Sequence, residues 1–165
     1  MNVLSSRIAT IQKSLKKITE FKQIIPIFQN IPPLNEKEFK KINNEVTFKT
    51  KDIYKKTIFF NNDLLNVSVI FWKPYAMSYI HNHPMYGCYF FPLYNGLIEH
   101  KYKEMDKYVI NIDSVRVKKD NVVYINDSIA LHSIENETSF IVPSFHCYSP
   151  SKFSVKYYDN NDIVY

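Results

Sequence analysis

The stretch NVSVIFW, residues 66–72, consists mostly of β-branched and aromatic residues, which favour an extended backbone. Nine similar runs lie between residues 57 and 158, and Asn, Asp, Pro and Gly separate them. Ten short strands at this spacing predict an antiparallel β-sandwich or barrel. The nine runs are TIFF (57–60), AMSYIH (76–81), CYFFPLY (88–94), LIEHKY (97–102), KYVINI (107–112), NVVYIN (121–126), ALHSIE (130–135), SFIVPSFHCY (139–148) and FSVKYY (153–158).

The N-terminal part of the chain has a helical pattern instead. Apolar residues recur three or four positions apart from Val3 to Phe21, which predicts one amphipathic helix over that range. After a connection with three prolines, the stretch LNEKEFKKIN (34–43) predicts a second short helix. Its N-cap is Asn35 and its capping-box partner is Glu38, three residues later.

The length and composition predict one folded domain. A chain of 165 residues with 45% hydrophobic and 16% aromatic residues can bury a sizeable core. We find no internal repeat and no low-complexity tract. We therefore expect one compact unit, in which residues 1–48 form a helical segment packed on a β-barrel of residues 49–165.

The distribution of charge argues against several kinds of partner. The net charge of +5 comes from lysines spread along the chain, whereas a nucleic-acid-binding protein needs a concentrated basic face. No run of about 18 apolar residues is present to span a membrane, and charges interrupt the N-terminus too often for a signal peptide. We expect a cytoplasmic monomer that binds neither nucleic acid nor membrane.

Residues 80–88, IHNHPMYGC, concentrate side chains that bind metals. His81 and His83 are two positions apart in a predicted strand, so both point to the same face. Alone, such a pair is weak evidence for a metal site, and the alternative is two histidines on a polar sheet face. His132 and His146 strengthen the case, because they lie in late strands that a closed barrel brings beside the early ones. We interpret His100 as a surface residue.

The late stretch SFHCY, residues 144–148, places polar side chains on one face. Strand alternation puts Ser144, His146 and Tyr148 together, and puts Phe145 and Cys147 on the opposite face. A polar triple on an inner face is costly unless it is hydrogen-bonded or functional. This side of the strand is therefore a candidate part of a functional site.

Three segments, taken together and in this order, resemble the cysteine dioxygenases of the cupin superfamily. They are WKPYAMSYIHNHPMYGC (72–88), YINDSIALHSIEN (124–136) and SFHCYSP (144–150). The resemblance covers roughly residues 54–150, and the N-terminal helices resemble the family only in kind. It implies a mainly β fold: a single cupin-type antiparallel β-barrel with short N-terminal α-helices.

The resemblance also implies a mononuclear iron(II) site. Its ligands would be His81, His83 and His132, and Cys88 stands where many cupins with this histidine pair carry a glutamate ligand. Three neutral imidazoles leave the metal its full positive charge, which favours a thiolate substrate.

Cys88 and Tyr148 match the pair that the family joins by a thioether cross-link. The alternative for Cys88 is a small buried apolar residue, which is the usual role of a free cysteine. By the same resemblance, the Tyr148 hydroxyl contacts the substrate or dioxygen, and His146, oriented by Ser144, holds that hydroxyl.

The resemblance to the family is weaker at the residues that bind the substrate carboxylate. The family binds it with an arginine two residues after a tyrosine, whereas this chain has Tyr54 and then Lys56. A lysine lacks the planar fork of a guanidinium. Lys56 therefore binds the same carboxylate less rigidly, serves a different substrate, or is a solvated lysine at a strand edge.

The function that the resemblance implies is oxidation of L-cysteine by O2 to cysteine sulfinate, a step of cysteine catabolism. Other thiols are alternatives: 3-mercaptopropionate, cysteamine, or an N-terminal cysteine of a peptide. A further alternative is a non-enzymatic cupin that binds metal or thiol as a sensor.

Overall fold

A computed structural model of the chain describes residues 2–106 and 108–158. The end of the predicted 49–165 segment, residues 159–165, lies outside the described residues, as does Lys107. The helices are α1 (Ser5–Leu15), α2 (Ile24–Gln29) and α3 (Glu36–Glu45), with short 3-10 turns at Asn2–Leu4 and Phe21–Gln23. The strands are β1 (Tyr54–Asn61), β2 (Asn66–Trp72), β3 (Ile80–His81), β4 (Cys88–Pro92), β5 (Leu97–Met105), β6 (Tyr108–Val117), β7 (Val123–Ile125), β8 (Leu131–Asn136), β9 (Val142–Tyr148) and β10 (Tyr157–Tyr158).

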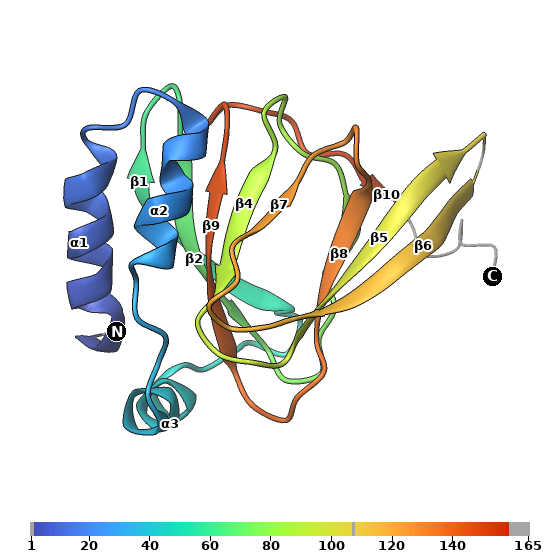
Figure 1. Cartoon of the computed structure of the whole chain (residues 1–165). Helices are drawn as coiled ribbons and strands as arrows, with labels where there is room; N and C mark the ends of the chain where they lie inside the picture. Colours follow the sequence, from blue (N-terminus) through green and yellow to red (C-terminus); the bar gives the residue numbers. More distant parts are fainter. Residues whose placement is uncertain (1, 107, 159–165) are drawn as a thin grey trace.

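The strands form two five-stranded antiparallel sheets that face each other (Figure 1). One sheet has the order β1-β2-β9-β4-β7 and the other the order β10-β3-β8-β5-β6. The predicted mainly β fold of antiparallel strands is confirmed, but within the described residues the sheets stay separate rather than forming one continuously hydrogen-bonded barrel. Two of the edge strands, β7 and β10, have only 3 and 2 residues, too few to extend a ladder from one sheet to the other.

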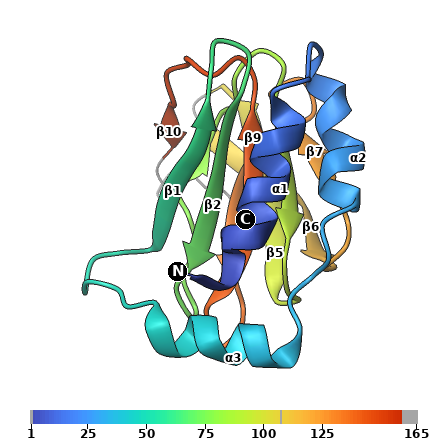
Figure 2. The same cartoon turned by 90° about the vertical axis from the view of Figure 1, so that its left-hand side faces the viewer.

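The helices cover one outer face of this sandwich. Figure 2 shows α1 and α2 in front of the sheet that contains β1, β2 and β9, with α3 across its lower end. Side chains from the helices, such as Ile11, Phe28 and Phe39, pack there with Phe145 and Cys147 of β9. A second apolar cluster belongs to strands of both sheets, and its members include Ile70, Trp72, Phe90, Leu97 and Ile134. The molecule therefore has three layers: helices, one sheet and the other sheet.

The prediction of one helix from Val3 to Phe21 is wrong. Helix α1 ends at Leu15, and a capping box between Glu20 and Gln23 starts a new helical segment that leads into α2. Pro26 is tolerated in the first turn of α2, because the amide hydrogen that proline lacks has no intrahelical partner there.

The second predicted helix is confirmed as α3, with its cap. The Glu38 N–H donates to Asn35 Oδ1 at 2.9 Å, and the Asn35 N–H donates to Glu38 Oε2 at 3.0 Å. Residues N-terminal to the sandwich thus form three helices where the pattern predicted two.

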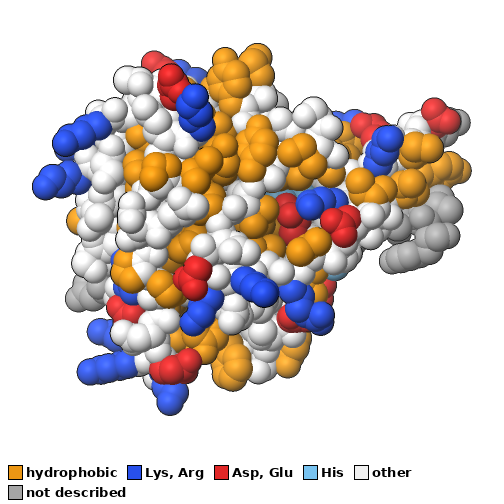
Figure 3. Space-filling model, in the orientation of Figure 1, with side chains coloured by type: hydrophobic (Ala, Val, Ile, Leu, Met, Phe, Trp, Pro, Cys, Tyr) orange, Lys and Arg blue, Asp and Glu red, His pale blue; other side chains and the backbone are white. Residues whose placement is uncertain are grey.

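The surface shown in Figure 3 carries lysine and arginine side chains dispersed among acidic and apolar ones. No helix within residues 2–106 and 108–158 is both long enough and apolar enough to cross a membrane.

Candidate active site

A cavity of about 510 Å³ lies between the two sheets, on the side of the edge strands β1 and β10. Its walls come from β1, β2 and β9 of one sheet, from β3 and β8 of the other, and from the segment that follows β9. Most of the predicted site residues line it. They are Tyr54, Lys56, His81, His132, His146 and Tyr148, whereas His83, Cys88 and Ser144 lie behind this lining.

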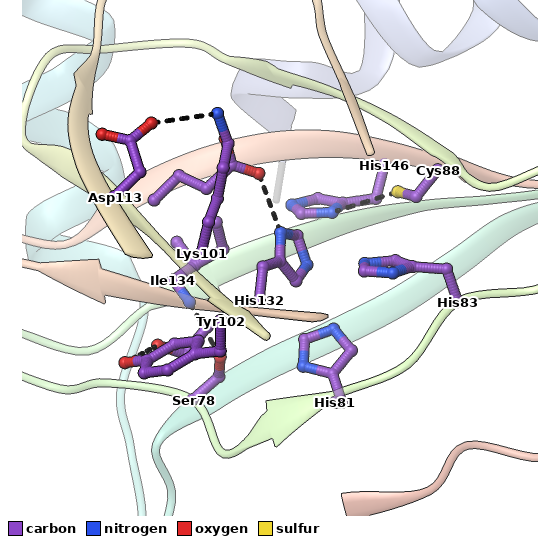
Figure 4. A network of polar contacts seen from close by, with 12 residues as sticks. Ser78, His81, His83, Cys88, Lys101, Tyr102, Asp113, His132, Ile134 and His146 are labelled. Carbon is purple, nitrogen blue, oxygen red and sulfur yellow. Dashed lines mark hydrogen bonds and ion pairs between the residues drawn. The ribbon is translucent and has the colours of Figure 1, made fainter. Parts of the chain in front are cut away.

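Three histidines converge at the cavity wall, as Figure 4 shows. His81 of β3 is directly opposite His132 of β8, and His83 follows in the loop after β3 rather than in the strand predicted for it. The ring centroids are 4.4 Å apart for His83 and His132, 4.7 Å for His81 and His132, and 5.5 Å for His81 and His83. One ligand atom from each residue lies within 4.8 Å of the other two, which is compatible with binding to a single ion.

Hydrogen bonds at Nδ1 orient two of these rings. His81 Nδ1–H donates to the backbone carbonyl of Tyr79 at 2.9 Å. His132 Nδ1 lies 2.9 Å from Oε1 of Glu99, a residue of β5 whose side chain is only 2% exposed. Both rings thereby leave Nε2 as the free nitrogen, and a partner of this kind is typical of metal-binding histidines.

The ring of His83 is the third member of the cluster, and one of its nitrogens is buried without a partner. Asp127 Oδ1 accepts from the backbone N–H of His83 at 2.7 Å and lies 3.0 Å from His83 Nδ1. His83 Nε2 is buried and has no hydrogen-bond partner. An orphaned imidazole nitrogen is costly unless a ligand satisfies it, so the residues present fit a metal ion held by three Nε2 atoms.

Glu99 and Asp127 were not predicted as site residues from the sequence. The signal for Glu99 was an acidic residue two positions after Leu97 in the predicted strand LIEHKY, and therefore on the same inward face. No sequence pattern indicated Asp127, because it lies in an exposed turn before β8. Its hydrogen bond with His83 depends on the tertiary structure.

Burial sets the protonation of the histidines. It lowers the pKa of His81, although the hydrogen bond to the Tyr79 carbonyl opposes this shift, and it lowers the pKa of His83 and of His132 far below the ordinary value. Proximity of the three rings disfavours adding a proton to any of them. The three imidazoles are therefore neutral, which is the form that binds metals. Burial also raises the pKa of Glu99 to about 7, although Lys101 opposes the shift.

A second polar row lines the opposite wall, on β9. Trp72 Nε1–H donates to Ser144 Oγ at 2.8 Å, Ser144 Oγ lies 2.8 Å from His146 Nε2, and His146 Nδ1 lies 3.4 Å from the Tyr148 hydroxyl. Phe145 and Cys147 pack on the helix side, so the predicted alternation along this strand is confirmed. The row holds the Tyr148 hydroxyl in one place.

Cys88 lies beside this row. Its Sγ is 4.0 Å from His146 Nδ1, and it is the register partner of Tyr148. Burial raises the pKa of both the Cys88 thiol and the Tyr148 hydroxyl well above their ordinary values. Both groups are therefore neutral at physiological pH.

Lys56 and Tyr54 extend the cavity wall on β1. The Lys56 ammonium lies 4.4 Å from the centroid of the Tyr148 ring, and the Tyr54 ring packs against Trp72 with centroids 5.2 Å apart. Although part of Lys56 is exposed, partial burial of its ammonium lowers its pKa.

The remaining histidine, His100, is outside this site. It belongs to β5, and its ring nitrogens lie 2.8 Å from Ser114 Oγ and 2.8 Å from Glu135 Oε2. It is thus hydrogen-bonded to neighbouring strands rather than freely solvated.

Comparison with solved structures defines the class of the fold. Oxalate oxidase in complex with the substrate analogue glycolate superposes with a TM-score of 0.54 at 12% identity, over 68% of this chain and 58% of that one. A mutant of Bacillus subtilis oxalate decarboxylase gives 0.50 at 14% identity, over 70% of this chain and 30% of that one. A protein from Klebsiella pneumoniae subsp. pneumoniae described as having a double-stranded β-helix domain gives 0.50 at 11% identity, over 71% and 94%. The fold is that of a cupin, or double-stranded β-helix.

The family follows from the sequence itself. The family model described as "Cysteine dioxygenase type I" matches residues 3–161, almost the whole chain. The chain belongs to the cysteine dioxygenase type I family, as its three motif segments predicted.

Proposed function

We propose that this protein is an iron(II)-dependent thiol dioxygenase that converts L-cysteine and O2 to cysteine sulfinate. The observation that carries the proposal is one cavity with a three-histidine cluster on one wall and the Ser144–His146–Tyr148 row on the other, in a member of this family. In the overall reaction the thiol sulfur gains both atoms of O2 and the thiol becomes a sulfinic acid. No other reductant or oxidant is needed.

Iron(II), bound through Nε2 of His81, His83 and His132, would supply the activation of dioxygen. Because the three ligands are neutral, the site keeps a positive charge that favours a substrate thiolate. The protein provides a pocket that partly excludes water and fixes the position of the reacting sulfur.

The second wall acts on the substrate through Tyr148. Its hydroxyl is neutral and its position is set by His146, which Ser144 and Trp72 orient in turn. A fixed neutral O–H next to the reacting atoms donates a hydrogen bond without adding a competing charge.

Of the two lysines that line the cavity, Lys51 and Lys56, Lys56 is the one beside Tyr148, and its ammonium suits the substrate carboxylate. Its ammonium lies beside the Tyr148 ring, and the cavity lining within the described residues contains no carboxylate that would neutralise it. Tyr54, two residues earlier on β1, contributes a hydroxyl to the same wall.

The test is oxygen consumption by the iron(II)-loaded protein with L-cysteine, with mass spectrometry of the product. We expect one O2 consumed per product molecule, and a product heavier than cysteine by two oxygen atoms. Zinc-loaded protein is the matched control, because zinc occupies the same histidines but has no redox chemistry. Absence of oxygen uptake with every thiol tested would contradict the proposal and leave a cupin that binds metal or thiol as a sensor.

A dioxygenase for another small thiol is the second candidate. Lys56 favours it, because it replaces the arginine with which the family binds the carboxylate of cysteine. Replacing Lys56 by Met should raise the KM for L-cysteine at least tenfold, because an ion-paired hydrogen bond is lost. The same substitution should leave cysteamine, which has no carboxylate, unaffected. Wild-type protein that oxidises cysteamine as fast as cysteine would show that Lys56 does not select the substrate.

A further inference from the structure

The segment after β9 crosses the mouth of the cavity. Three of its side chains, Phe153, Val155 and Tyr157, line the cavity. Phe153 stacks on Tyr148 with ring centroids 5.7 Å apart. This segment, residues 149–158, therefore forms a wall of the site and contributes side chains to it.

The end of the segment is fixed in register beside the metal-binding histidines. In the β10–β3 pair, Tyr157 is opposite His81 and Tyr158 is opposite Ile80. Asn82, the residue after β3, extends this pairing, because its N–H donates to the Lys156 carbonyl at 3.2 Å and its Oδ1 accepts from the Lys156 N–H at 2.7 Å. Opposed residues of an antiparallel pair share a face. Tyr157 therefore points with His81 into the cavity.

Tyr157 also meets the opposite sheet. It lines the same cavity as Tyr54 and Lys56, which belong to the edge strand β1. Burial, together with Tyr157, raises the pKa of Tyr54, so this hydroxyl keeps its proton and remains a donor. Tyr54 and Tyr157 thus face one cavity from the edge strands of the two sheets, and Lys56 lines the same wall as Tyr54.

We propose that Tyr157 is a substrate-binding residue, whose hydroxyl acts with the Tyr54 hydroxyl and the Lys56 ammonium to bind the carboxylate of the thiol substrate. A carboxylate has two oxygens that accept hydrogen bonds, and a lysine alone does not provide the paired donors of a guanidinium. A phenol O–H held by the backbone of β10 supplies a second donor at a fixed position. This inference rests on the proposed function, since it names how that same cavity selects its substrate.

The experiment compares Tyr157→Phe with Tyr158→Phe. Tyr158 is the matched control, because it is the adjacent residue of β10 and its hydroxyl donates to Glu104, outside the cavity. Binding is followed through the fluorescence of Trp72, which is the chain's single tryptophan and lines the cavity. The titrants are 3-mercaptopropionate and cysteamine, added to iron(II)-loaded protein without oxygen.

For Tyr157→Phe we expect about tenfold weaker binding of 3-mercaptopropionate and unchanged binding of cysteamine. In turnover with L-cysteine the same variant should raise KM and leave kcat nearly unchanged, because the ring that packs at the cavity mouth is retained. Tyr158→Phe should change none of these quantities.

Equal weakening for both titrants would overturn the inference, since it would mean that Tyr157 only supports the wall. Unchanged binding of both would overturn it as well. The titration needs no turnover, so it separates two failures. If the wild-type protein oxidises no thiol but Tyr157→Phe still loses carboxylate binding selectively, the proposed reaction is wrong and the assignment of Tyr157 stands.

Discussion

Cys88 and Tyr148 are directly opposite each other on the neighbouring strands β4 and β9. Their side chains therefore share a face, and both lie next to His146 Nδ1, with Sγ at 4.0 Å and the hydroxyl at 3.4 Å. A buried cysteine beside a buried tyrosine at a candidate oxidation site is arranged for covalent bonding between them.

We predict that a thioether bond forms between Cys88 Sγ and the carbon next to the Tyr148 hydroxyl during aerobic turnover with iron(II) and cysteine. The bond replaces one S–H and one C–H hydrogen, and O2 accepts the two electrons and two protons. The intact chain should thus become two hydrogens lighter by mass spectrometry. Cys88→Ser and Tyr148→Phe should keep the unmodified mass, whereas Cys147→Ser, altered on the opposite face of β9, should still lose the two hydrogens.

Removing one imidazole should prevent stable metal binding. His132→Ala eliminates a ligand that is buried between His81 and His83, so we expect bound iron or cobalt, measured by elemental analysis, to fall from about one per chain to a small fraction. His100→Ala is the control, because that ring is hydrogen-bonded to Ser114 and lies outside the cluster. Full metal content in His132→Ala would contradict the assignment of the site.

Glu99 should tune the metal site through His132. Glu99→Gln keeps the shape but removes the carboxylate that makes the imidazole more basic, so we expect metal affinity to fall about 10- to 100-fold. The melting temperature of the metal-free protein should not fall, since the buried carboxylate itself is costly. Glu104→Gln, an exposed position on the same strand, should change neither quantity. Unchanged affinity in Glu99→Gln would rule out this role.

Arg7 should contribute to the stability of the helical layer. It is 8% exposed, and its guanidinium donates to the Pro32 carbonyl at 2.8 Å, to the Pro33 carbonyl at 2.9 Å and to both Glu38 oxygens at 2.8 and 3.0 Å. Arg7→Met should lower the free energy of unfolding by about 2 kcal/mol, measured in urea, because partly buried acceptors lose their charged donor. Lys13→Met, an exposed change on the same helix, should have little effect.

Much of the sandwich was predictable from local pattern. All ten strand runs correspond to strands, because β-branched and aromatic residues between turn residues encode an extended backbone. The choice between a sandwich and a closed barrel, and the order of strands in each sheet, were not predictable, because pairing depends on contacts between residues far apart in the chain.

The N-terminal helices show what apolar spacing cannot predict, which is where one helix ends and the next begins. The stripe from Val3 to Phe21 is a real apolar pattern, yet the chain turns after Leu15 because a local capping box at Glu20 and Gln23 starts another segment. Apolar spacing alone does not distinguish one long helix from two short ones whose buried faces meet the same sheet.

The grouping of the site residues was predictable in part. The histidines and the alternation along β9 are encoded locally, and the family resemblance added their expected roles. The contributions of Asp127 and Tyr157 were not predictable, because tertiary structure alone brings Asp127 to His83 and Tyr157 to the cavity. For Glu99, the sequence shows only an acidic residue at an inward position, and its contact with His132 depends on the fold.

The two faces of β9 affect how this protein tolerates amino-acid substitutions. Phe145 and Cys147 face the helices, while His146 and Tyr148 face the cavity, so one backbone carries both sets. A substitution that shifts Phe145 must move the neighbouring peptide units and therefore the Tyr148 hydroxyl. Folding stability and reaction geometry are thus mechanically linked along this strand. Variants selected for a more rigid helical layer should also change the rate of turnover, although none of their substitutions touches the substrate.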